Sequence, residues 1–427
     1  MERAKQIIKE YLIDPFKEKE YSYIGMEFEY PVICLGGAAS FREIGSAFLA
    51  RLMEEHGFQE ELRGTDGYYV RVSKDGDSVS YDYSYGLLEL SMGKQRSLHT
   101  LRARMLPLLK LAQEYYRTYD CVLTGMGTRP VRERNVEYTC DPFYTMIREY
   151  LERYTEDKRP DKCFPNMFSV QTHIDVPYAD LLETYNLFNR LDFVRGLLFA
   201  NSLGLSEGGR VNYCVRDWLW DSCGIPNTGI YDKSFASLEE LAEEISREKI
   251  FVEKDGERLY VIKPTRLADY LADKDTPQER IRLFRSFKRV VLNSYHVLEV
   301  RGDCTQPVKD SFVTAAFHVG IAYNYRKAAR VLERFLTDHK LGASNSELRE
   351  MAVAGREIAA EEDMKLLLYQ LLDIAREGLA ARGYGEEILL TPLRERVLRF
   401  TNPAKELHKA LQAGTDIREL LFRYAEM

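Results

Sequence analysis

The segment Ile24–Tyr30 constrains the fold of this chain more than any other stretch of its sequence. Side chains alternate between the two faces of a β-strand, so the spacing places Met26 and Phe28 on one face. Glu27 and Glu29 then share the opposite face. Two carboxylates on one strand face repel each other unless cations lie between them. The segment therefore predicts either a solvated strand face or a site that holds cations.

Three further segments place polar side chains on strands in a similar way. They contribute Gln171 and His173 from residues 169–175, Glu299 and Arg301 from residues 295–303, and Asp82 and Glu89 from residues 78–92. Asp82 and Glu89 are an odd number of residues apart, which puts them on opposite faces of a straight strand. Gly86 offers a bulge or bend that returns both side chains to one face.

The chemistry of these side chains indicates metal-assisted phosphoryl transfer. Together the segments supply five carboxylates, one imidazole and one guanidinium. Oxygen ligands with few softer ones suit Mg²⁺ or Mn²⁺ rather than zinc. A guanidinium two residues from a carboxylate suits a phosphate bound to such metals, which favours ATP as the phosphate source. The sequence has no GxxxxGK[ST] loop and no GxGxxG motif after a predicted strand, so a P-loop enzyme is excluded.

Composition argues against several other classes of protein. The 427 residues carry 60 Lys and Arg against 67 Asp and Glu, and this net charge of −7 lacks the basic footprint of a nucleic-acid-binding protein. No stretch approaches the roughly 18 apolar residues of a membrane span. We therefore expect no nucleic-acid partner, no membrane association and a cytoplasmic location. The seven scattered cysteines form no CxxC pair and are expected to be inert thiols in a reducing compartment.

Hydrophobic periodicity predicts mixed strands and helices up to about residue 300 and helices after about residue 310. Strands are expected at 23–33, 68–72, 78–92, 121–127, 167–176 and 291–301, with a hairpin at 249–263. Helices are expected at 1–20, 40–56, 97–118 and 178–201. Because strands and helices do not alternate regularly, an α+β fold is favoured over a doubly wound parallel sheet.

Five short motifs allow a comparison with known families. They are GMEFE at 25–29, LELS at 88–91 followed by Leu98-His99, VQTHID at 170–175, LFANS at 198–202 and LEVRGD at 298–303. In this order and spacing, from about residue 20 to residue 310, the chain resembles the glutamate–cysteine ligase family. That family belongs to the glutamine synthetase-like carboxylate–amine ligases.

The resemblance implies an architecture. A curved antiparallel sheet of the glutamine synthetase-like catalytic type would form an open funnel with helices on its outside. Residues 1–310 would make this catalytic core, and residues 311–427 would make a helical C-terminal region packed on it.

The resemblance also implies two sets of metal ligands. The set nearer the transferred phosphate is Glu27, His173 and Glu299, and the set near the amino acid substrate is Glu29, Asp82 and Glu89. The segment 82–88 is one residue longer and less glycine-rich than its counterpart in the family.

Further roles concern the phosphate and the nucleotide. Arg301 matches an arginine that contacts the transferred phosphate, and with Glu299 it forms the candidate catalytic pair. Gln171 and Arg216 join Arg301 as candidate nucleotide contacts, and Arg210 also falls in the family's arginine-containing segment.

The implied activity is an ATP-dependent ligation. ATP would phosphorylate the side-chain carboxylate of glutamate, or of a similar amino acid, and an amine would displace the phosphate to give an amide. Cysteine is the expected acceptor, which would give γ-glutamylcysteine and a role in glutathione biosynthesis. The family's Asp-rich stretch ending Arg-Thr-Gly appears here only as Asn227-Thr228-Gly229, so another acceptor amine remains open. A phosphotransferase and a non-catalytic nucleotide-binding homologue are the alternatives from other classes.

Overall fold

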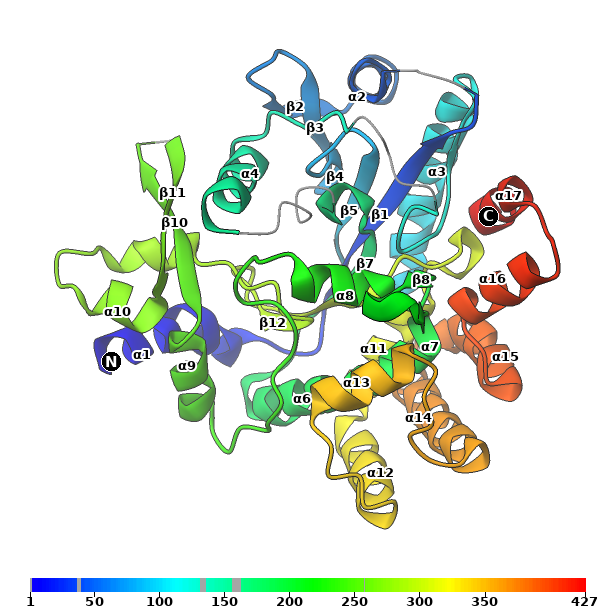
Figure 1. Cartoon of the computed structure of the whole chain (residues 1–427). Helices are drawn as coiled ribbons and strands as arrows, with labels where there is room; N and C mark the ends of the chain where they lie inside the picture. Colours follow the sequence, from blue (N-terminus) through cyan, green and yellow to red (C-terminus); the bar gives the residue numbers. More distant parts are fainter. Residues whose placement is uncertain (1, 37–39, 131–135, 156–162, 257) are drawn as a thin grey trace.

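The computed structural model describes residues 2–36, 40–130, 136–155, 163–256 and 258–427. Its centre is a nine-stranded antiparallel sheet in the order β12-β13-β7-β1-β5-β4-β3-β2, with β6 paired to β1 (Figure 1). The strands are β1 (Ile24–Cys34), β2 (Gln59–Arg63), β3 (Tyr69–Lys74), β4 (Asp77–Tyr81), β5 (Leu87–Gln95), β6 (Cys121–Leu123), β7 (Ser169–Ile174), β12 (Val290–Leu292) and β13 (Leu298–Cys304). Two small sheets pair β8 (Gly204–Leu205) with β9 (Val211–Asn212) and β10 (Lys249–Asp255) with β11 (Arg258–Arg266). The antiparallel sheet with its surrounding helices confirms the predicted α+β class.

Helices surround the sheet, and α12 to α14 lie at the end of the molecule away from α2, β2 and β3 in Figure 1. The helices before residue 310 are α1 (Glu2–Ile8), α2 (Phe41–His56), α3 (Leu98–Arg117), α4 (Pro142–Tyr154), α6 (Tyr178–Arg190), α7 (Asp192–Phe199), α8 (Val215–Ser222), α9 (Leu238–Ser246) and α10 (Leu267–Ala272). Those after it are α11 (Val313–Tyr323), α12 (Tyr325–Asp338), α13 (Asn345–Val353), α14 (Glu361–Arg382), α15 (Thr391–Arg399), α16 (Pro403–Gln412) and α17 (Ile417–Ala425). None of the described helices has both the length and the apolar character needed to cross a membrane.

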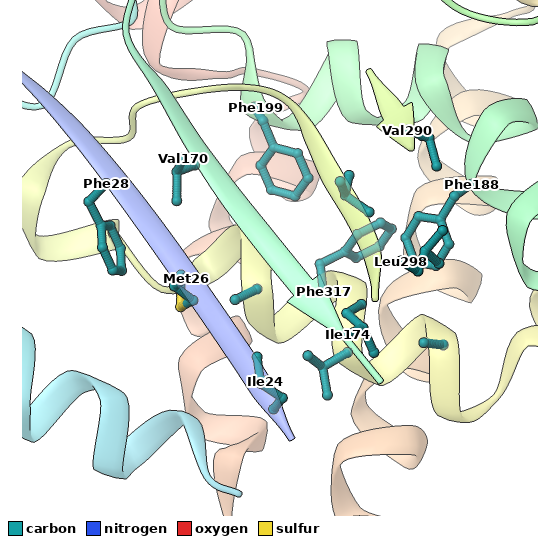
Figure 2. Close-up of a cluster of buried hydrophobic side chains, with 14 of the residues drawn as sticks. Ile24, Met26, Phe28, Val170, Ile174, Phe188, Phe199, Val290, Leu298 and Phe317 are labelled. Carbon is teal, nitrogen blue, oxygen red and sulfur yellow. The ribbon is translucent and has the colours of Figure 1, made fainter. Parts of the chain in front are cut away.

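One face of the central strands is apolar and fully covered. Met26 and Phe28 of β1 are 1% exposed, as the predicted alternation requires. Figure 2 shows them with Val170 of β7 and Phe317 of α11 in one buried cluster. Burial of a side chain of this size stabilises the fold by about 1.5–3 kcal/mol, so this packing fixes which face of β1 points away from the core.

The C-terminal helices share this core with the sheet. α11 packs against β7 and against α14. A single hydrophobic cluster runs from Ala4 to Val397 and includes side chains from both sides of residue 310. The division into a core and a C-terminal region at that residue stays a prediction.

Two predicted strands are each divided by a turn. The segment 78–92 forms β4 and β5, which pair with each other, and Tyr83 in the connection has a positive φ of 61°. Of the bulge or bend expected at Gly86, the structure has the bend: residues 82–86 form a turn between the two strands, and Asp82 and Glu89 line one cavity. The segment 291–301 likewise divides into β12 and β13, and His296 lies half-buried in the turn with a φ of 57°.

A disulfide joins Cys34 at the end of β1 to Cys121 at the start of β6. The two residues face each other in the antiparallel register of these strands. The expectation that all seven cysteines are free thiols is wrong for this pair. The other five cysteines are not part of a disulfide in the described structure, and four of them are buried.

Candidate active site

Apart from Asp82 and the arginines before residue 220, the predicted site residues lie on four neighbouring strands, β13, β7, β1 and β5. Their cross-strand pairs are Glu27 with Gln171, Glu29 with Glu89, and Glu299 with His173. Paired residues point to the same face of a sheet. These side chains therefore gather on the face opposite the apolar cluster, and strands far apart in the sequence contribute to one site.

Glu27 and His173 are in contact at the centre of this face. The Nε2 atom of His173 lies 3.6 Å from Oε1 of Glu27 and, although buried, has no hydrogen-bond partner among the described residues. Gly25 lies beside the imidazole, and an added Cβ there would be in van der Waals contact with His173 at 3.4 Å. Burial raises the pKa of Glu27, His173 opposes the shift, and Glu299 adds to it.

Glu29 is held in place by β7. Its carboxylate accepts hydrogen bonds from the backbone N–H of Ser169 at 2.6 Å and from Nε2 of Gln171 at 3.2 Å. Burial raises the pKa of Glu29 to about 7, although the nearby Arg216 opposes the shift. Gln171 therefore orients a carboxylate in this structure.

Glu89 and Asp82 form the third part of the cluster. Burial and the charges of Asp82, Glu27 and Glu29 raise the pKa of Glu89 well above its ordinary value. Ser91 donates a hydrogen bond to Glu89. The hydroxyl of Tyr144, on α4, donates to Asp82, so a helix outside the sheet closes over this side of the cluster.

Glu299 and Arg301 lie at the other edge of the cluster. Nδ2 of Asn293 donates to Glu299 at 2.8 Å, and Nε of Arg301 lies 3.6 Å from the same carboxylate. Arg301 also donates to the backbone oxygen of Ser286 and lies over the ring of Phe287. The guanidinium thus stays beside the carboxylates with part of its donor set free.

Two cavities meet at the carboxylates, and Glu27 and Glu89 line both of them. The larger, of about 650 Å³, also contains the cations Lys19, Arg71 and Lys94 and the acids Glu61, Asp77 and Asp175. We call it the basic-rimmed cavity.

The smaller cavity has a different character. It measures about 280 Å³ and contains the rest of the carboxylate cluster together with Gln171 and Arg301. Its other lining is mainly aromatic, and we call it the aromatic cavity.

The donor set suits a hard divalent cation. In the residues that the structure describes, no three or more His, Cys, Asp or Glu side chains are already close enough together to hold a metal ion. The buried carboxylates nevertheless repel one another, and His173 presents an unpartnered ring nitrogen beside Glu27. A cation would relieve both conditions, so the residues fit Mg²⁺ or Mn²⁺, and the six-ligand assignment stays a prediction.

The predicted arginines occupy different positions. Arg216 is buried, donates to the backbone oxygen of Gly302, and lies near enough to Glu29 to affect its pKa. Arg210 is exposed and lines a separate cavity of about 630 Å³ with Thr228 and Gly229. The structure therefore brings Arg216 close to the cluster and leaves Arg210 outside both cavities that meet there.

Sequence reasoning missed the groups that hold the cluster from outside the sheet. Tyr144 lies on α4, and Asn293 lies in the turn between β12 and β13. Asn293 is followed by Ser294, a turn signal that could have separated the two strands. No local pattern points to Tyr144, because its contact with Asp82 depends on how α4 packs over the sheet.

Sequence comparisons find relatives of one kind. No protein-family model matches the chain. It is 24% identical over 421 residues to the chloroplastic glutamate–cysteine ligase of Medicago truncatula, covering 95% of this chain and 81% of the relative. Identity to the chloroplastic glutamate–cysteine ligase of Nicotiana tabacum is 23% over 422 residues, covering 95% and 79%. The cytoplasmic location stays a prediction.

Solved structures share the fold. The glutamate–cysteine ligase of Francisella tularensis in complex with AMP superposes with a TM-score of 0.51 at 13% identity, covering 95% of this chain and 89% of that one. A bifunctional glutathione synthetase from Pasteurella multocida gives a TM-score of 0.54 at 13% identity over 99% of this chain, which spans 54% of that protein. The comparisons confirm the predicted resemblance and support an enzyme of the C–N-bond-forming ligases.

Proposed function

We propose that this chain is an ATP-dependent carboxylate–amine ligase that activates the side-chain carboxylate of glutamate, or of a similar amino acid. The observation that carries the proposal is the convergence, between two cavities, of acidic side chains from β1, β5 and β13 with His173 of β7. The basic-rimmed cavity suits the triphosphate of ATP by its size and by Lys94, because Lys19 and Arg71 are paired with Asp175 and Glu61 of the same lining. The amino acid and the amine would meet in the aromatic cavity.

The first step would form an acyl phosphate. An oxygen of the donor carboxylate attacks the γ-phosphorus of ATP, the bond to the β–γ bridging oxygen breaks, and ADP leaves. Arg301 would stabilise the phosphoryl group in transfer, because its guanidinium lies at the edge of the cluster with donors to spare. In the second step the amine attacks the acyl carbon, phosphate leaves with the C–O electron pair, and the amine loses a proton.

Divalent cations would complete the site. One would be held by Glu27, His173 and Glu299, and a second by Glu29, Asp82 and Glu89. Bound there, such ions neutralise phosphate oxygens. The chain's own contribution is orientation: Asn293 holds Glu299, and Ser169 and Gln171 hold Glu29. We therefore assign Gln171 to positioning Glu29 and not to the nucleotide.

Cysteine is the first acceptor to test, because the curated relatives are named for it. Mass spectrometry of a reaction of glutamate, cysteine, ATP and Mg²⁺ should show ADP, phosphate and γ-glutamylcysteine. Replacing cysteine by a panel of other amines tests the general ligase, whose signature is an amide that depends on the added amine. A phosphorylated product without any amide would identify a phosphotransferase, and ATP binding without turnover would identify a binding protein.

A further inference from the structure

The aromatic cavity has a lining that the proposed chemistry leaves unexplained. Beside the carboxylates it is formed by rings from several separate segments, Tyr83, Phe143, Tyr144, Phe164, Trp220 and Phe287. Phosphoryl transfer needs charge and hydrogen bonds, and neither requires an aromatic surface. The rings therefore indicate something about the molecule that enters the cavity beside the phosphate.

These rings support one another in fixed positions. The rings of Tyr83 and Phe164 stack with centroids 4.9 Å apart, and Phe164 meets the indole of Trp220 edge-on at 5.0 Å. Trp220 in turn stacks on Phe287 at 5.7 Å. Aromatic pairs at such distances contribute packing energy beyond their buried area. The aromatic lining is thus a preformed wall, whose rings hold their positions before a ligand binds.

Part of this wall is left uncovered toward the cavity. Tyr83 and Phe164 belong to the interior of a hydrophobic cluster, whereas Phe143, Trp220 and Phe287 are only half-buried members packed against it. These half-buried rings all line the cavity. Apolar ring surface that faces a cavity favours a ligand with apolar surface of its own.

The lining of the aromatic cavity holds few cations that could bind a second carboxylate. Apart from Arg301, the cation in its lining is Arg285. Nη1 of Arg285 donates to the backbone oxygens of Arg282 and Phe284, and the guanidinium lies 5.7 Å from the ring centre of Phe143. For the α-carboxylate of an acceptor, the lining offers the remaining N–H groups of Arg285 and those of Arg301 that a phosphate leaves unused, whereas rings make up most of the rest.

We infer that the acceptor of this ligase is an amine with a flat, apolar body, such as an aromatic or arylalkyl amine, that packs on Trp220 and Phe287. The inference rests on the proposed function and names the substrate class of the same site. The ring of the acceptor lies against the aromatic wall, and its amino group faces the carboxylates, where an acyl phosphate would be formed.

The adenine of ATP is the competing occupant, because it too is flat. The neighbouring cavity favours the nucleotide instead, since it is more than twice as large and carries Lys19, Arg71 and Lys94. The carboxylates that the two cavities share would then lie between the nucleotide and the acceptor.

Acceptor kinetics provide the first test. Amide formation from glutamate, ATP and Mg²⁺ is measured with 2-phenylethylamine, cysteine, and 2-aminobutyrate, which matches cysteine in size. We expect kcat/KM for 2-phenylethylamine to exceed that for both small amino acids at least tenfold. Equal values, or a preference for cysteine, would overturn the inference. Trapping of the acyl phosphate by hydroxylamine runs in parallel, and failure to form any hydroxamate from glutamate refutes the proposed function instead.

The two tryptophans of the chain provide a matched pair of variants. Trp220→Ala should lower kcat/KM for 2-phenylethylamine at least tenfold, and by a larger factor than it lowers hydroxamate formation from glutamate. The side chain of Trp218, two residues away in the sequence, lines the separate 630 Å³ cavity. Trp218→Ala should therefore change neither kcat/KM for 2-phenylethylamine nor hydroxamate formation by more than twofold. Equal losses in both variants would contradict the assignment.

A binding measurement works even without turnover. Trp218→Phe leaves Trp220 as the sole tryptophan, and its emission should change on titration with 2-phenylethylamine. Trp220→Phe leaves Trp218, which should not respond. If the emission of Trp220 responds to adenosine and not to the arylalkyl amine, the base occupies the aromatic cavity and the inference is wrong.

Discussion

Glu89 shows at the level of a single residue how this site opposes the stability of the fold. Burial and three neighbouring acids raise its pKa well above the ordinary value. At neutral pH the unfolded chain therefore ionises this group more readily than the folded protein does, which lowers the free energy of unfolding. Sites that concentrate like charge for function commonly carry such a cost.

Replacing Glu89 by Gln should separate stability from activity. We expect Glu89→Gln to raise the free energy of unfolding of the metal-free protein by about 1 kcal/mol in urea titrations, because the amide cannot ionise. Amide formation should fall at least a hundredfold. Glu333→Gln on the exposed side of α12 serves as the control and should change neither quantity. A destabilised but fully active Glu89→Gln protein would contradict the role given to this carboxylate.

Metal binding should be visible as stabilisation. An ion that binds only the folded chain adds about 2.7 kcal/mol at a hundred times its Kd, so Mg²⁺ should raise the Tm. In Glu27→Gln the increase in Tm on adding Mg²⁺ should be smaller, because a ligand beside His173 is lost. Removal of divalent ions with EDTA should stop ATP turnover in the wild-type protein. Equal Mg²⁺ shifts in both proteins would remove Glu27 from the ligand set.

Among the elements, β13 is tied to the helices behind it by buried charges. Asp303 accepts a hydrogen bond from Arg195 of α7 at 3.4 Å, and its other oxygen lies 3.0 Å from Nε2 of His318 on α11. Arg349 of α13 donates to the backbone oxygen of Asp192 at the start of α7. β13 presents Glu299 and Arg301 to the cavity. Its position is thus fixed near its C-terminal end by the contacts of Asp303.

This arrangement predicts a loss of stability in acid. Burial opposes ionisation of Asp303, but Arg195 and His318 hold its pKa at about 2, below its ordinary value near 3.8. A lowered pKa gives stability that is present above the ordinary pKa and is lost as pH falls through the folded value. Asp303 should contribute roughly 2.5 kcal/mol that disappears between about pH 4 and pH 2. Asp303→Asn should be less stable at pH 7 and should lose this part of the acid dependence in urea unfolding. If the stability of Asp303→Asn depended on pH in the same way as that of the wild-type protein, this role of Asp303 would be contradicted.

The disulfide between β1 and β6 makes a second prediction for an element. It closes a loop of 87 residues, and such a link stabilises a fold by about 2–4 kcal/mol. The Cys34→Ser/Cys121→Ser variant should be less stable by that amount. Reductant should lower the free energy of unfolding of the wild-type protein to the value of this variant. Thiol titration of the denatured protein supplies the control, with five thiols expected before reduction. Seven thiols in the unreduced protein would show that the bond does not form.

For the whole molecule, local patterns predicted the strand faces better than the turns. The alternation of β1 correctly separates Met26 and Phe28 from Glu27 and Glu29, because one face of that strand is fully buried. The connection after β4 escaped notice because Tyr83 adopts a positive φ without a glycine to mark it. A left-handed residue of this kind has no sequence signal of its own.

The groups that enclose the site also could not be predicted from local sequence patterns. The pairing of Glu29 with Glu89 joins residues that are 60 positions apart in the sequence, and the motif resemblance, not periodicity, indicated it. Tyr144 and Trp220 reach the cluster from α4 and α8, and their positions depend on tertiary packing. Carboxylates could therefore be predicted as a set, whereas the walls around them could not.

Isotope transfer offers the most direct test of acyl phosphate formation by this molecule. Glutamate labelled with ¹⁸O in its side-chain carboxylate is incubated with ATP, Mg²⁺ and an accepted amine, and the released phosphate is examined by mass spectrometry. One ¹⁸O atom in each phosphate is expected, since a carboxylate oxygen bonds to phosphorus and leaves with it. Amide formation with unlabelled phosphate would contradict the account.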